Sequence, residues 1–434
     1  MLSKVRQSLK NINFKLYAAL LVLGLVPAIY TTFRTFLIGQ LPNEWSFSIA
    51  GQLSWVNLLY EILKEAIILP LFFFIGQVKN DKYAFSGRIR SGLLVTGCIY
   101  TLLSSVVCVF APQLLSLMAA DPLLISTSVT YIRIESIASV FSILMQFTLV
   151  ALVTANKSKY LYTITFTQLF LLLLSDTFLV SSLPCSLNLG INGVGYSNIL
   201  VNAILLFISL HLLSKEGISI WNKSKPDFSW LKDFFSIGGI SGIESLVRNL
   251  AYMVMIARMV NVIGEQGTYW VANNFIWCWL LLPVLQLGEL IKQEVSTNKN
   301  NVRTNALGYF TLTGVISFLW ICSIPLWRPF MVLVVGSTDV EELFSLVLLL
   351  LGFYVLFAFQ NVFDSTFYGL GKTKYMLFES VVTNTIYYGI AFILYLYKLW
   401  TPTLTSIALL FGVGNAFDSI VSFFAYLHLL KKEK

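Results

Sequence analysis

Charged residues are scarce in this chain of 434 amino acids. Asp, Glu, Lys and Arg together make up 12% of it, whereas hydrophobic residues make up 57% and the mean hydropathy is +0.78. Soluble proteins carry about 25% charged residues. A soluble domain of this length cannot bury so much apolar surface, so the composition excludes a water-soluble fold and predicts a membrane protein.

Residues that support metal, redox or nucleotide chemistry are also few. The chain has two histidines and five cysteines, and the cysteines show no paired spacing, so we expect neither a metal site nor a disulfide framework. It contains no Walker motif, nucleophile elbow or glycine-rich phosphate loop. We therefore expect no enzyme activity and no cofactor other than a coupling ion, H⁺ or Na⁺. Work done by such a chain must draw on an ion gradient, the membrane potential or a substrate gradient.

Long apolar runs, by contrast, fill most of the sequence. A transmembrane helix needs about 20 mainly apolar residues, whereas an outer-membrane barrel shows short segments of alternating polarity. The runs predict an all-α membrane protein with twelve transmembrane helices. The predicted spans cover residues 16–41, 49–77, 91–112, 124–152, 160–183, 191–213, 234–260, 268–291, 304–327, 341–368, 375–397 and 403–428.

The placement of the positive charges gives the predicted orientation. The formal net charge is +8, and Lys and Arg gather before the first predicted span, in every second loop and behind the last span. The opposite loops carry little more than Arg328 and Lys398. This asymmetry follows the positive-inside rule and predicts a multi-pass protein of the plasma (inner) membrane with both termini in the cytoplasm. Because the rule explains the basic residues, we expect no nucleic acid partner.

A repeated sequence motif indicates that the chain has two similar halves. Residues 154–160 (TANKSKY) and residues 369–375 (GLGKTKY) lie 215 positions apart, and a polar stretch divides the predicted spans six and six. We expect an N-terminal six-helix bundle over 1–213, a cytoplasmic linker over 214–233 and a C-terminal six-helix bundle over 234–434. Duplicated units related by an axis along the membrane normal are typical of transporters.

Short motifs in a fixed order carry a resemblance to a known family. Residues 120–122 (ADP) followed by 131–134 (YIRI), residues 192–197 (NGVGYS), and Gln360 followed by 369–373 (GLGKT) resemble stretches of the multidrug and toxic compound extrusion (MATE) transporters. These belong to the wider multidrug/oligosaccharidyl-lipid/polysaccharide exporter superfamily. The resemblance implies a V-shaped pair of pseudo-symmetric six-helix bundles around a cavity that opens alternately to each side. It also implies export of bulky, usually cationic organic molecules against an inward flow of Na⁺ or H⁺.

The chain departs from this family at charged positions. Members usually carry an aspartate five residues before a glycine in the first span, and here Arg34 precedes Gly39. Arg248 aligns with a glutamate that is common in the seventh span. The aspartate of the fifth span is present as Asp176, whereas Leu172 replaces the asparagine usually found four residues before it. By this alignment, guanidinium groups replace two carboxylates that the family associates with ion coupling.

Ionisable residues inside the predicted spans are the candidate site residues. A charge at mid-membrane costs at least about 2.5–3.5 kcal/mol, so it normally faces a cavity or a partner. We expect ion coupling at Asp176, Glu65 and Glu61. We expect the substrate cavity to include Arg34, Lys64, Glu244, Arg248, Asp364 and Gln360.

Structural alternatives apply to several of these residues. Glu61, Lys64 and Glu65 share one helix face, so the two carboxylates repel and leave a proton-accepting site unless Lys64 or Arg34 neutralises them. A cluster of these residues with Asp176 around one wet pocket is the functional interpretation, and a network of structural ion pairs is the alternative. Glu244 and Arg248 lie one helical turn apart and are predicted to pair.

Three further residues carry structural expectations. Asp418 follows Gly412 and Gly414, where close helix packing is expected. Glu379, near a predicted cytoplasmic end, is expected to be solvated or to snorkel toward the membrane surface. Trp230 is expected to anchor a short interfacial helix ahead of the seventh span.

The sequence therefore predicts a MATE-like secondary transporter that exports an amphipathic organic solute by alternating access. The expected partners are the lipid bilayer and a small organic substrate, and we expect a monomer. Two alternatives remain open. The arginines suit a flippase for a lipid or lipid-linked glycan, because basic cavities fit phosphate-bearing head groups. The fold is also compatible with a transport-inactive membrane scaffold.

Overall fold

The protein is helical throughout the part that the structure describes. This computed structural model covers residues 2–42, 45–78, 81–155, 157, 159–218, 226–337 and 339–432. Every regular element in these ranges is a helix, which confirms the predicted all-α class. Residues 219–225 of the predicted linker lie outside the described residues.

Each predicted span coincides with helical structure, and two further short helices, α1 (Leu2–Asn11) and α12 (Asn301–Thr304), lie outside the spans. The spans correspond to α2 (Phe14–Gly39), α3 (Ser46–Gly76), α4 (Lys82–Leu117), α5 (Pro122–Thr154), α6 (Lys159–Leu179), α7 (Ile191–Lys215), α8 (Leu231–Tyr252) with η1 (Met253–Ala257) and α9 (Arg258–Val262), α10 (Gln266–Phe275) with η2 (Ile276–Leu280) and α11 (Leu282–Thr297), α13 (Ala306–Phe330) with η3 (Met331–Val335), α14 (Val340–Gly369), α15 (Thr373–Val382) with η4 (Thr383–Tyr388) and α16 (Gly389–Leu396), and α17 (Leu404–Lys432).

Most of these helices are suited to a membrane by length and composition. Among the described residues, 10 helices are long and apolar enough to cross a bilayer, and a pair bent by 52°, Gln266–Leu280 and Leu282–Thr297, brings the number to 11. The remaining predicted span is α3, which has 31 residues and carries three charged side chains. The prediction of a polytopic helical protein is confirmed, and the count of twelve is approximately supported.

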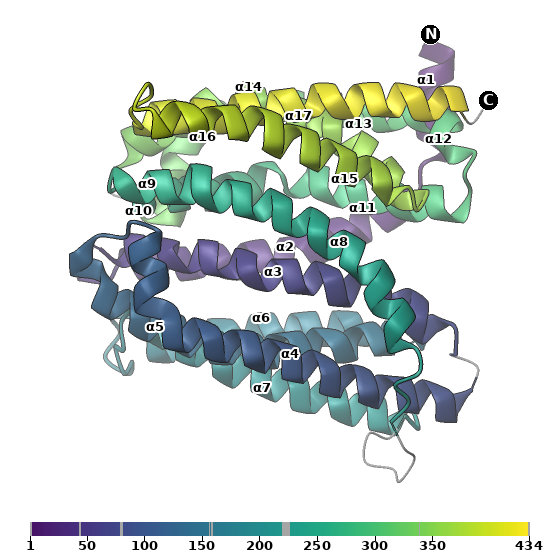
Figure 1. The fold of residues 1–434 in the computed structure, drawn as a ribbon, viewed down its shortest axis with the longest axis horizontal. Helices are drawn as coiled ribbons and strands as arrows, with labels where there is room; N and C mark the ends of the chain where they lie inside the picture. The colour runs from purple at the N-terminus through teal and green to yellow at the C-terminus, as the bar shows by residue number, and fades with distance from the viewer. Residues whose placement is uncertain are drawn as a thin grey trace. The chain divides into compact units, whose positions relative to one another are not determined.

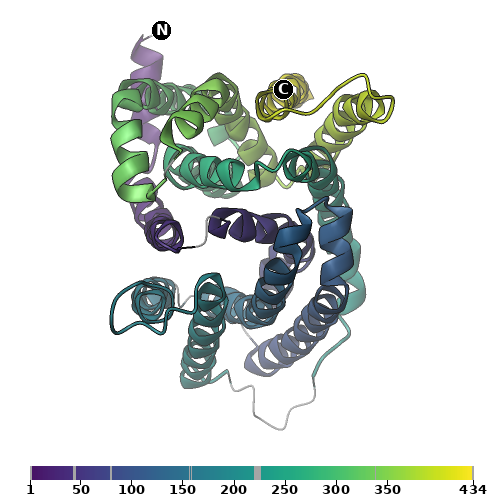
Figure 2. The same ribbon diagram turned by 90° about the vertical axis from the view of Figure 1, so that its left-hand side faces the viewer.

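The helices form two compact units that differ in composition from the two halves of the sequence. Unit 1 comprises Met1–Phe36 and Val254–Lys434, and unit 2 comprises Leu37–Met253. Thus α2 up to Phe36 belongs with the C-terminal helices, whereas α8 belongs with the N-terminal ones. Figure 1 labels the helices of each unit, and Figure 2 shows them from the end. The pseudo-symmetric division of the sequence at 214–233 stays a prediction.

Unit 2 is organised around α5, which packs against α3, α4 and α7. Hydroxyl groups link these apolar helices. The Tyr60 and Ser104 hydroxyls lie 3.1 Å apart, Ser104 donates to the Ser136 carbonyl at 2.9 Å, and Tyr100 donates to the Tyr60 carbonyl at 3.0 Å. Where no water is present, such interhelical hydrogen bonds stabilise helix pairs by about 0.6–2 kcal/mol each. They fix the rotation of α3 and α4 and hence the direction of the charged side chains on α3.

Trp230 contributes to unit 2 as a buried residue, which corrects the expectation that it anchors an interfacial helix. It is 4% exposed, and its ring centroid lies 4.9 Å from that of Phe234 and 6.0 Å from that of Phe74. Its indole N–H is within hydrogen-bonding distance of the Ser91 hydroxyl (3.1 Å) and the Asp227 carbonyl (2.8 Å). The indole N–H is satisfied within the protein, so this ring does not need the lipid headgroup region. No separate helix occurs within residues 226–230.

Unit 1 is organised around α14, which packs against α11, α13 and α17. Aromatic rings fill the contact with α17, where the centroids of Phe363 and Tyr426 are 4.9 Å apart. The bend between η2 and α11 lies at Leu281, two residues before Pro283, which cannot donate a helical hydrogen bond. Tyr17 of α2 donates to the carbonyl of Pro283 at 2.9 Å, so the bent segment is tied to the first span.

Candidate functional site

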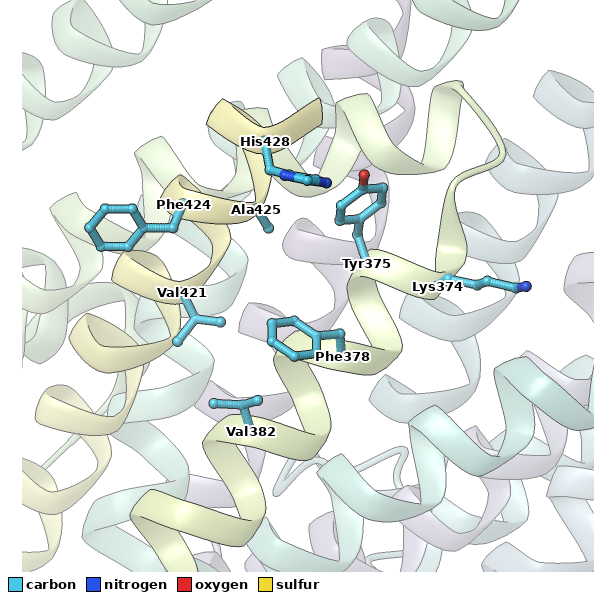
Figure 3. A pocket seen from close by; sticks show the side chains of 8 residues that line it. All are labelled: Lys374, Tyr375, Phe378, Val382, Val421, Phe424, Ala425 and His428. Carbon is cyan, nitrogen blue, oxygen red and sulfur yellow. The ribbon is translucent and has the colours of Figure 1, made fainter. Parts of the chain in front are cut away.

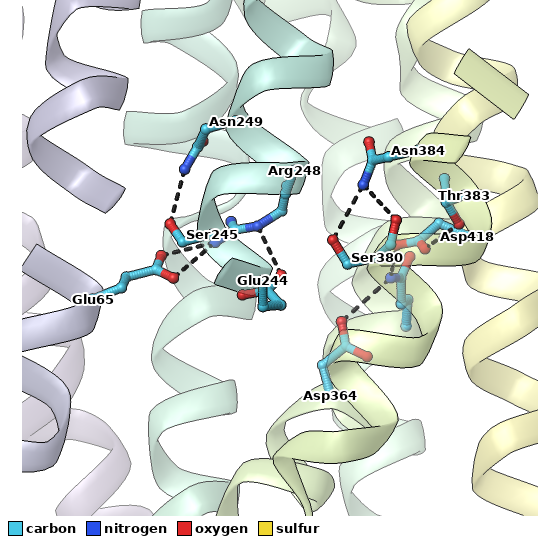
Figure 4. Close-up of polar contacts among 11 residues, drawn as sticks. Glu65, Glu244, Ser245, Arg248, Asn249, Asp364, Ser380, Thr383, Asn384 and Asp418 are labelled. Atoms are coloured by element: carbon cyan, nitrogen blue, oxygen red, sulfur yellow. Dashed lines mark hydrogen bonds and ion pairs between the residues drawn. The ribbon is translucent and has the colours of Figure 1, made fainter. Parts of the chain in front are cut away.

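A polar cluster lies inside unit 1, between α14, η4 and α17 (Figure 4). Gln360 and Asp364 are one turn apart on α14 and therefore point to the same side of that helix. The Gln360 amide donates to Asp418 Oδ2 at 2.5 Å and to Asp364 Oδ2 at 3.3 Å. Thr383 donates to Asp418 Oδ1 at 2.6 Å, and Ser419 donates to Gln360 Oε1 at 2.9 Å. One amide thus bridges two carboxyl groups from different helices.

Glu379 of α15 belongs to the same cluster, which corrects the expectation that it is solvated. It is 3% exposed, and its carboxyl group interacts electrostatically with those of Asp364 and Asp418. Asp364 Oδ1 and Glu379 Oε1 are both shielded from solvent and receive no hydrogen bond within the described residues. Glu379 is buried because its side of the helix faces the bundle, whereas its neighbour Phe378, 58% exposed, faces outward.

Glycines allow the helices around this cluster to approach closely. A Cβ atom at Gly412 would lie 2.3 Å from Phe353, and one at Gly414 would lie 2.5 Å from the Tyr388 hydroxyl. Either distance is too short for real Cβ atoms, so α17 reaches α14 and η4 only because these positions lack side chains. The close packing expected next to Asp418 is confirmed.

A second polar cluster lies inside unit 2, between α3 and α8 (Figure 4). Arg248 Nη2 donates to both carboxylate oxygens of Glu65, at 2.8 and 3.0 Å, and Arg248 Nε donates to Glu244 Oε1 at 3.2 Å. The predicted pairing of Glu244 with Arg248 is confirmed, whereas the partner on α3 was not predicted. The Arg248 side chain is 48% exposed, but those of Glu65 and Glu244 are 15% and 10% exposed. The guanidinium group therefore presents one accessible cation backed by two shielded carboxylates.

The other predicted residues of α3 form a pair of their own. Lys64 Nζ lies 3.0 Å from Glu61 Oε2, and both side chains are about two-fifths exposed, at 40% and 41%. Neutralisation of Glu61 by Lys64, one of the alternatives left open by the sequence, is what the structure shows. With Glu65 bound to Arg248, each of these two carboxylates has a cationic partner. Their role in ion coupling stays a prediction.

Asp176 and Arg34 lie in different units. Asp176 of α6 is 1% exposed in unit 2, and Arg34 of α2 is half-buried in unit 1. Next to Asp176, the Ser175 hydroxyl is hydrogen-bonded to that of Ser197 on α7. The proposed common pocket for these residues stays a prediction.

Glu135 is a buried carboxylate that the sequence interpretation missed. It is 6% exposed on α5, and its Oε1 accepts a hydrogen bond from the Asn198 amide of α7 at 2.7 Å. Its position inside the predicted span 124–152 was a sufficient signal, because an ionisable residue in a span is a candidate by default. Together with the Ser175–Ser197 bond, it forms a polar seam through α5, α6 and α7.

Metal binding finds no support in this arrangement. Across the described ranges, no group of three or more His, Cys, Asp or Glu side chains has the geometry to hold a metal ion. The carboxyl groups in unit 1 contact amide and hydroxyl groups instead.

The fold is similar to that of solved transporter structures. An inward-facing multidrug resistance MATE family transporter of the MOP superfamily matches with a TM-score of 0.80 and 16% identity, over 93% of this chain and 94% of that one. An outward-facing structure matches at 0.73 and 17%, over 99% and 98%. A MOP superfamily transporter from Pyrococcus furiosus, whose binding pocket is described as having reverse polarity, matches at 0.68 and 15%, over 98% and 97%. No family model and no curated protein sequence matches the chain. The chain has the fold of the MATE transporters, as its sequence motifs predicted.

Proposed function

We propose that this protein is a secondary active transporter that exports an amphipathic organic solute by alternating access, driven by an inward flow of H⁺. The similarity of fold to MATE transporters over nearly the whole chain supports transport. The observation that carries the coupling is the pair of orphaned carboxyl oxygens on Asp364 and Glu379. In this proposal the protein lies in the plasma (inner) membrane as a monomer with both termini in the cytoplasm, as the positive charges predict.

The coupling step follows from the chemistry of the unit 1 cluster. Two carboxylates side by side in an apolar interior repel, and neither Asp364 nor Glu379 has an ion-pair partner within the described residues. Retention of one proton between them removes the repulsion. Loss of that proton changes the charge of the pair from −1 to −2, and the added negative charge attracts a cation or drives a rearrangement of α14 against α15. Because the Gln360 amide donates to both Asp364 and Asp418, a change in the charge of Asp364 also alters the hydrogen bond to Asp418.

The substrate is proposed to contact the half-exposed cluster on α3 and α8. Arg248 and the exposed pair of Glu61 and Lys64 offer both signs of charge to an amphipathic solute. Arg34 of unit 1 is proposed as a separate substrate contact, and Asp176 and Glu65 are proposed to respond to a coupling ion in unit 2. Na⁺ coupling is the alternative to H⁺, because carboxyl, amide and hydroxyl oxygens also bind Na⁺.

Flux into proteoliposomes tests this proposal. The purified protein is given a pH gradient or a Na⁺ gradient together with a fluorescent organic cation. We expect the pH gradient to drive flux, and Asp364→Asn and Glu379→Gln to lower it by about tenfold or more, equivalent to about 1.4 kcal/mol. Glu289→Gln, which removes a 48% exposed carboxylate, is the matched control. Unchanged flux in both cluster variants contradicts the coupling site.

A second candidate function is transport of an anionic or lipid-linked substrate. The exposed guanidinium of Arg248 favours it, since basic cavities suit phosphate-bearing head groups. The reverse polarity described for the Pyrococcus furiosus transporter is in line with this alternative. The same assay with an anionic dye and a fluorescent lipid distinguishes the candidates. If the protein is well folded but transports none of these compounds, the result favours the transport-inactive scaffold.

A further inference from the structure

A groove with an apolar wall runs along unit 1 between α15 and the C-terminal half of α17 (Figure 3). Its volume is about 580 Å³, within the range of about 300–1,000 Å³ that ligand pockets occupy. Phe378 and Val382 form one wall, and Val421 and Phe424 form the other. Phe378 and Phe424 are 58% and 64% exposed, so the groove opens at the surface of the unit.

One end of the groove is cationic. Lys374 in the first turn of α15 and His428 near the end of α17 both line it and are both exposed. Tyr375 lies between them, with its ring centroid 6.4 Å from that of His428, and stacks on Phe367 at 5.1 Å. None of the residues that line the groove is acidic. Two more lysines, Lys431 and Lys432, follow in the last turn of α17.

The position of the cationic end matches the depth of a lipid headgroup. This end is the start of α15 and the finish of α17, which the positive-inside rule places on the cytoplasmic side. From Lys374 to Val382 the helix rises by roughly 12 Å at about 1.5 Å per residue. One leaflet contributes about 15 Å of hydrocarbon. The groove therefore extends from headgroup level through most of the inner leaflet.

We propose that this groove binds one anionic glycerophospholipid of the cytoplasmic leaflet. Its acyl chain lies between the phenylalanine and valine walls, and its phosphate contacts Lys374 Nζ and the imidazole of His428. The charge complementarity selects this occupant, because the cytoplasmic leaflet is negatively charged and each cationic residue near it contributes about fivefold in affinity, from about 1 kcal/mol. A zwitterionic lipid fills the same groove without this gain.

Binding of such a lipid has a consequence for the carboxyl cluster, and that consequence rests on the proposed function. Glu379 follows Phe378 on α15, and Asp418 lies one turn before Val421 on α17. The same two helices therefore line the groove and hold the carboxyl groups within one helical turn of it. A bound lipid fixes the separation of α15 and α17 next to the proposed proton site.

Retention of defined lipids by the delipidated full-length protein tests the site without any transport assay. Native mass spectrometry compares phosphatidylglycerol with phosphatidylcholine of identical acyl chains. We expect preferential retention of phosphatidylglycerol by the wild type and about a fivefold loss of this lipid on Lys374→Gln. The double variant with His428→Gln should lose the preference, whereas phosphatidylcholine retention should stay unchanged. Lys215→Gln, at the end of α7 in unit 2, is the matched control for lysine removal.

A second pair of variants tests the acyl-chain part of the groove. Val421→Trp fills the groove and should reduce the retention of both lipids. Ile420→Trp, at a 56% exposed position of the same helix that does not line the groove, should leave both unchanged. Equal retention of the two lipids by the wild type, or full phosphatidylglycerol retention in the Lys374/His428 double variant, overturns the proposal. Binding of free glycerol phosphate as tight as that of the lipid overturns the role of the apolar walls.

Discussion

Arg248 of α8 donates from one nitrogen, Nη2, to both carboxylate oxygens of Glu65 on α3, at 2.8 and 3.0 Å. The two residues are 183 positions apart in the chain. Their contact joins the second predicted span to the seventh, across the linker that separates the two halves of the sequence. It also occupies a glutamate that the sequence presented as an ion-coupling candidate.

The Glu65–Arg248 contact should appear as a coupling energy. Glu65→Gln and Arg248→Gln are each expected to lower stability, and the double variant to lose less than the sum, with a coupling of about 1 kcal/mol. The half-exposed guanidinium keeps the value modest because solvent screens it. Thermal unfolding in detergent measures all four proteins. Lys64→Gln combined with Arg248→Gln is the control, and additive losses for Glu65 and Arg248 contradict the contact.

Close packing of α3 on α8 should make one glycine sensitive and leave its neighbour tolerant. A Cβ at Gly242 would lie 2.9 Å from Ala66 Cβ, whereas one at Gly239 would meet nothing within 4 Å. We expect Gly242→Ala to destabilise the protein by about 1–3 kcal/mol through overpacking. Gly239→Ala should be neutral or stabilise it by about 0.5–1 kcal/mol, since glycine weakens a helix interior. Equal melting temperatures for the two variants contradict this close approach.

The hydroxyl of Thr383 should stabilise the carboxyl cluster of unit 1. Thr383→Val removes its 2.6 Å hydrogen bond to Asp418 and leaves a half-buried acceptor without this donor, at an expected cost of about 1 kcal/mol. Thr366→Val is the matched control, because that buried hydroxyl donates only to the Val362 carbonyl of its own helix. The difference between the two variants in thermal unfolding is the measurement. A larger loss of thermal stability in Thr366→Val than in Thr383→Val contradicts the stabilising role of the Thr383 hydroxyl.

The turn that leads into α8 should depend on acid pH. The Ser229 hydroxyl and amide donate to the Asp227 carboxylate, and with the nearby Arg88 they lower the pKa of Asp227 from its ordinary value of 3.8. Because the folded-state pKa is depressed, this stabilisation is fully present above pH 3.8 and is lost as the pH falls below it through the folded-state pKa. Melting temperatures between pH 3 and 6 should therefore fall less steeply for Asp227→Asn than for the wild type. Parallel curves contradict the assignment.

Expectations based on local sequence were confirmed where one helix determines the outcome. Glu244 and Arg248 pair because a spacing of four residues places them on one helix face. Gly412 and Gly414 permit close packing because they lack a Cβ wherever the neighbouring helix lies. The expectation that Glu379 is exposed to solvent was wrong, because its distance from the end of the span gave no information on the direction in which its side chain points. Glu135 was missed although its position in an apolar run marked it.

Composition by itself determined that this chain is a helical membrane protein and where its helices occur, because both follow from hydrophobicity summed over about 20 consecutive residues, which does not depend on packing. The resemblance to the MATE fold came separately, from short motifs in a fixed order. Only the tertiary structure decided which charges meet: Glu65 with Arg248, and Asp364 with Glu379 and Asp418. Such meetings depend on how each helix is rotated about its axis and which helix packs beside it. That is decided by interhelical contacts between residues far apart in the chain, such as the approach of Gly242 to Ala66.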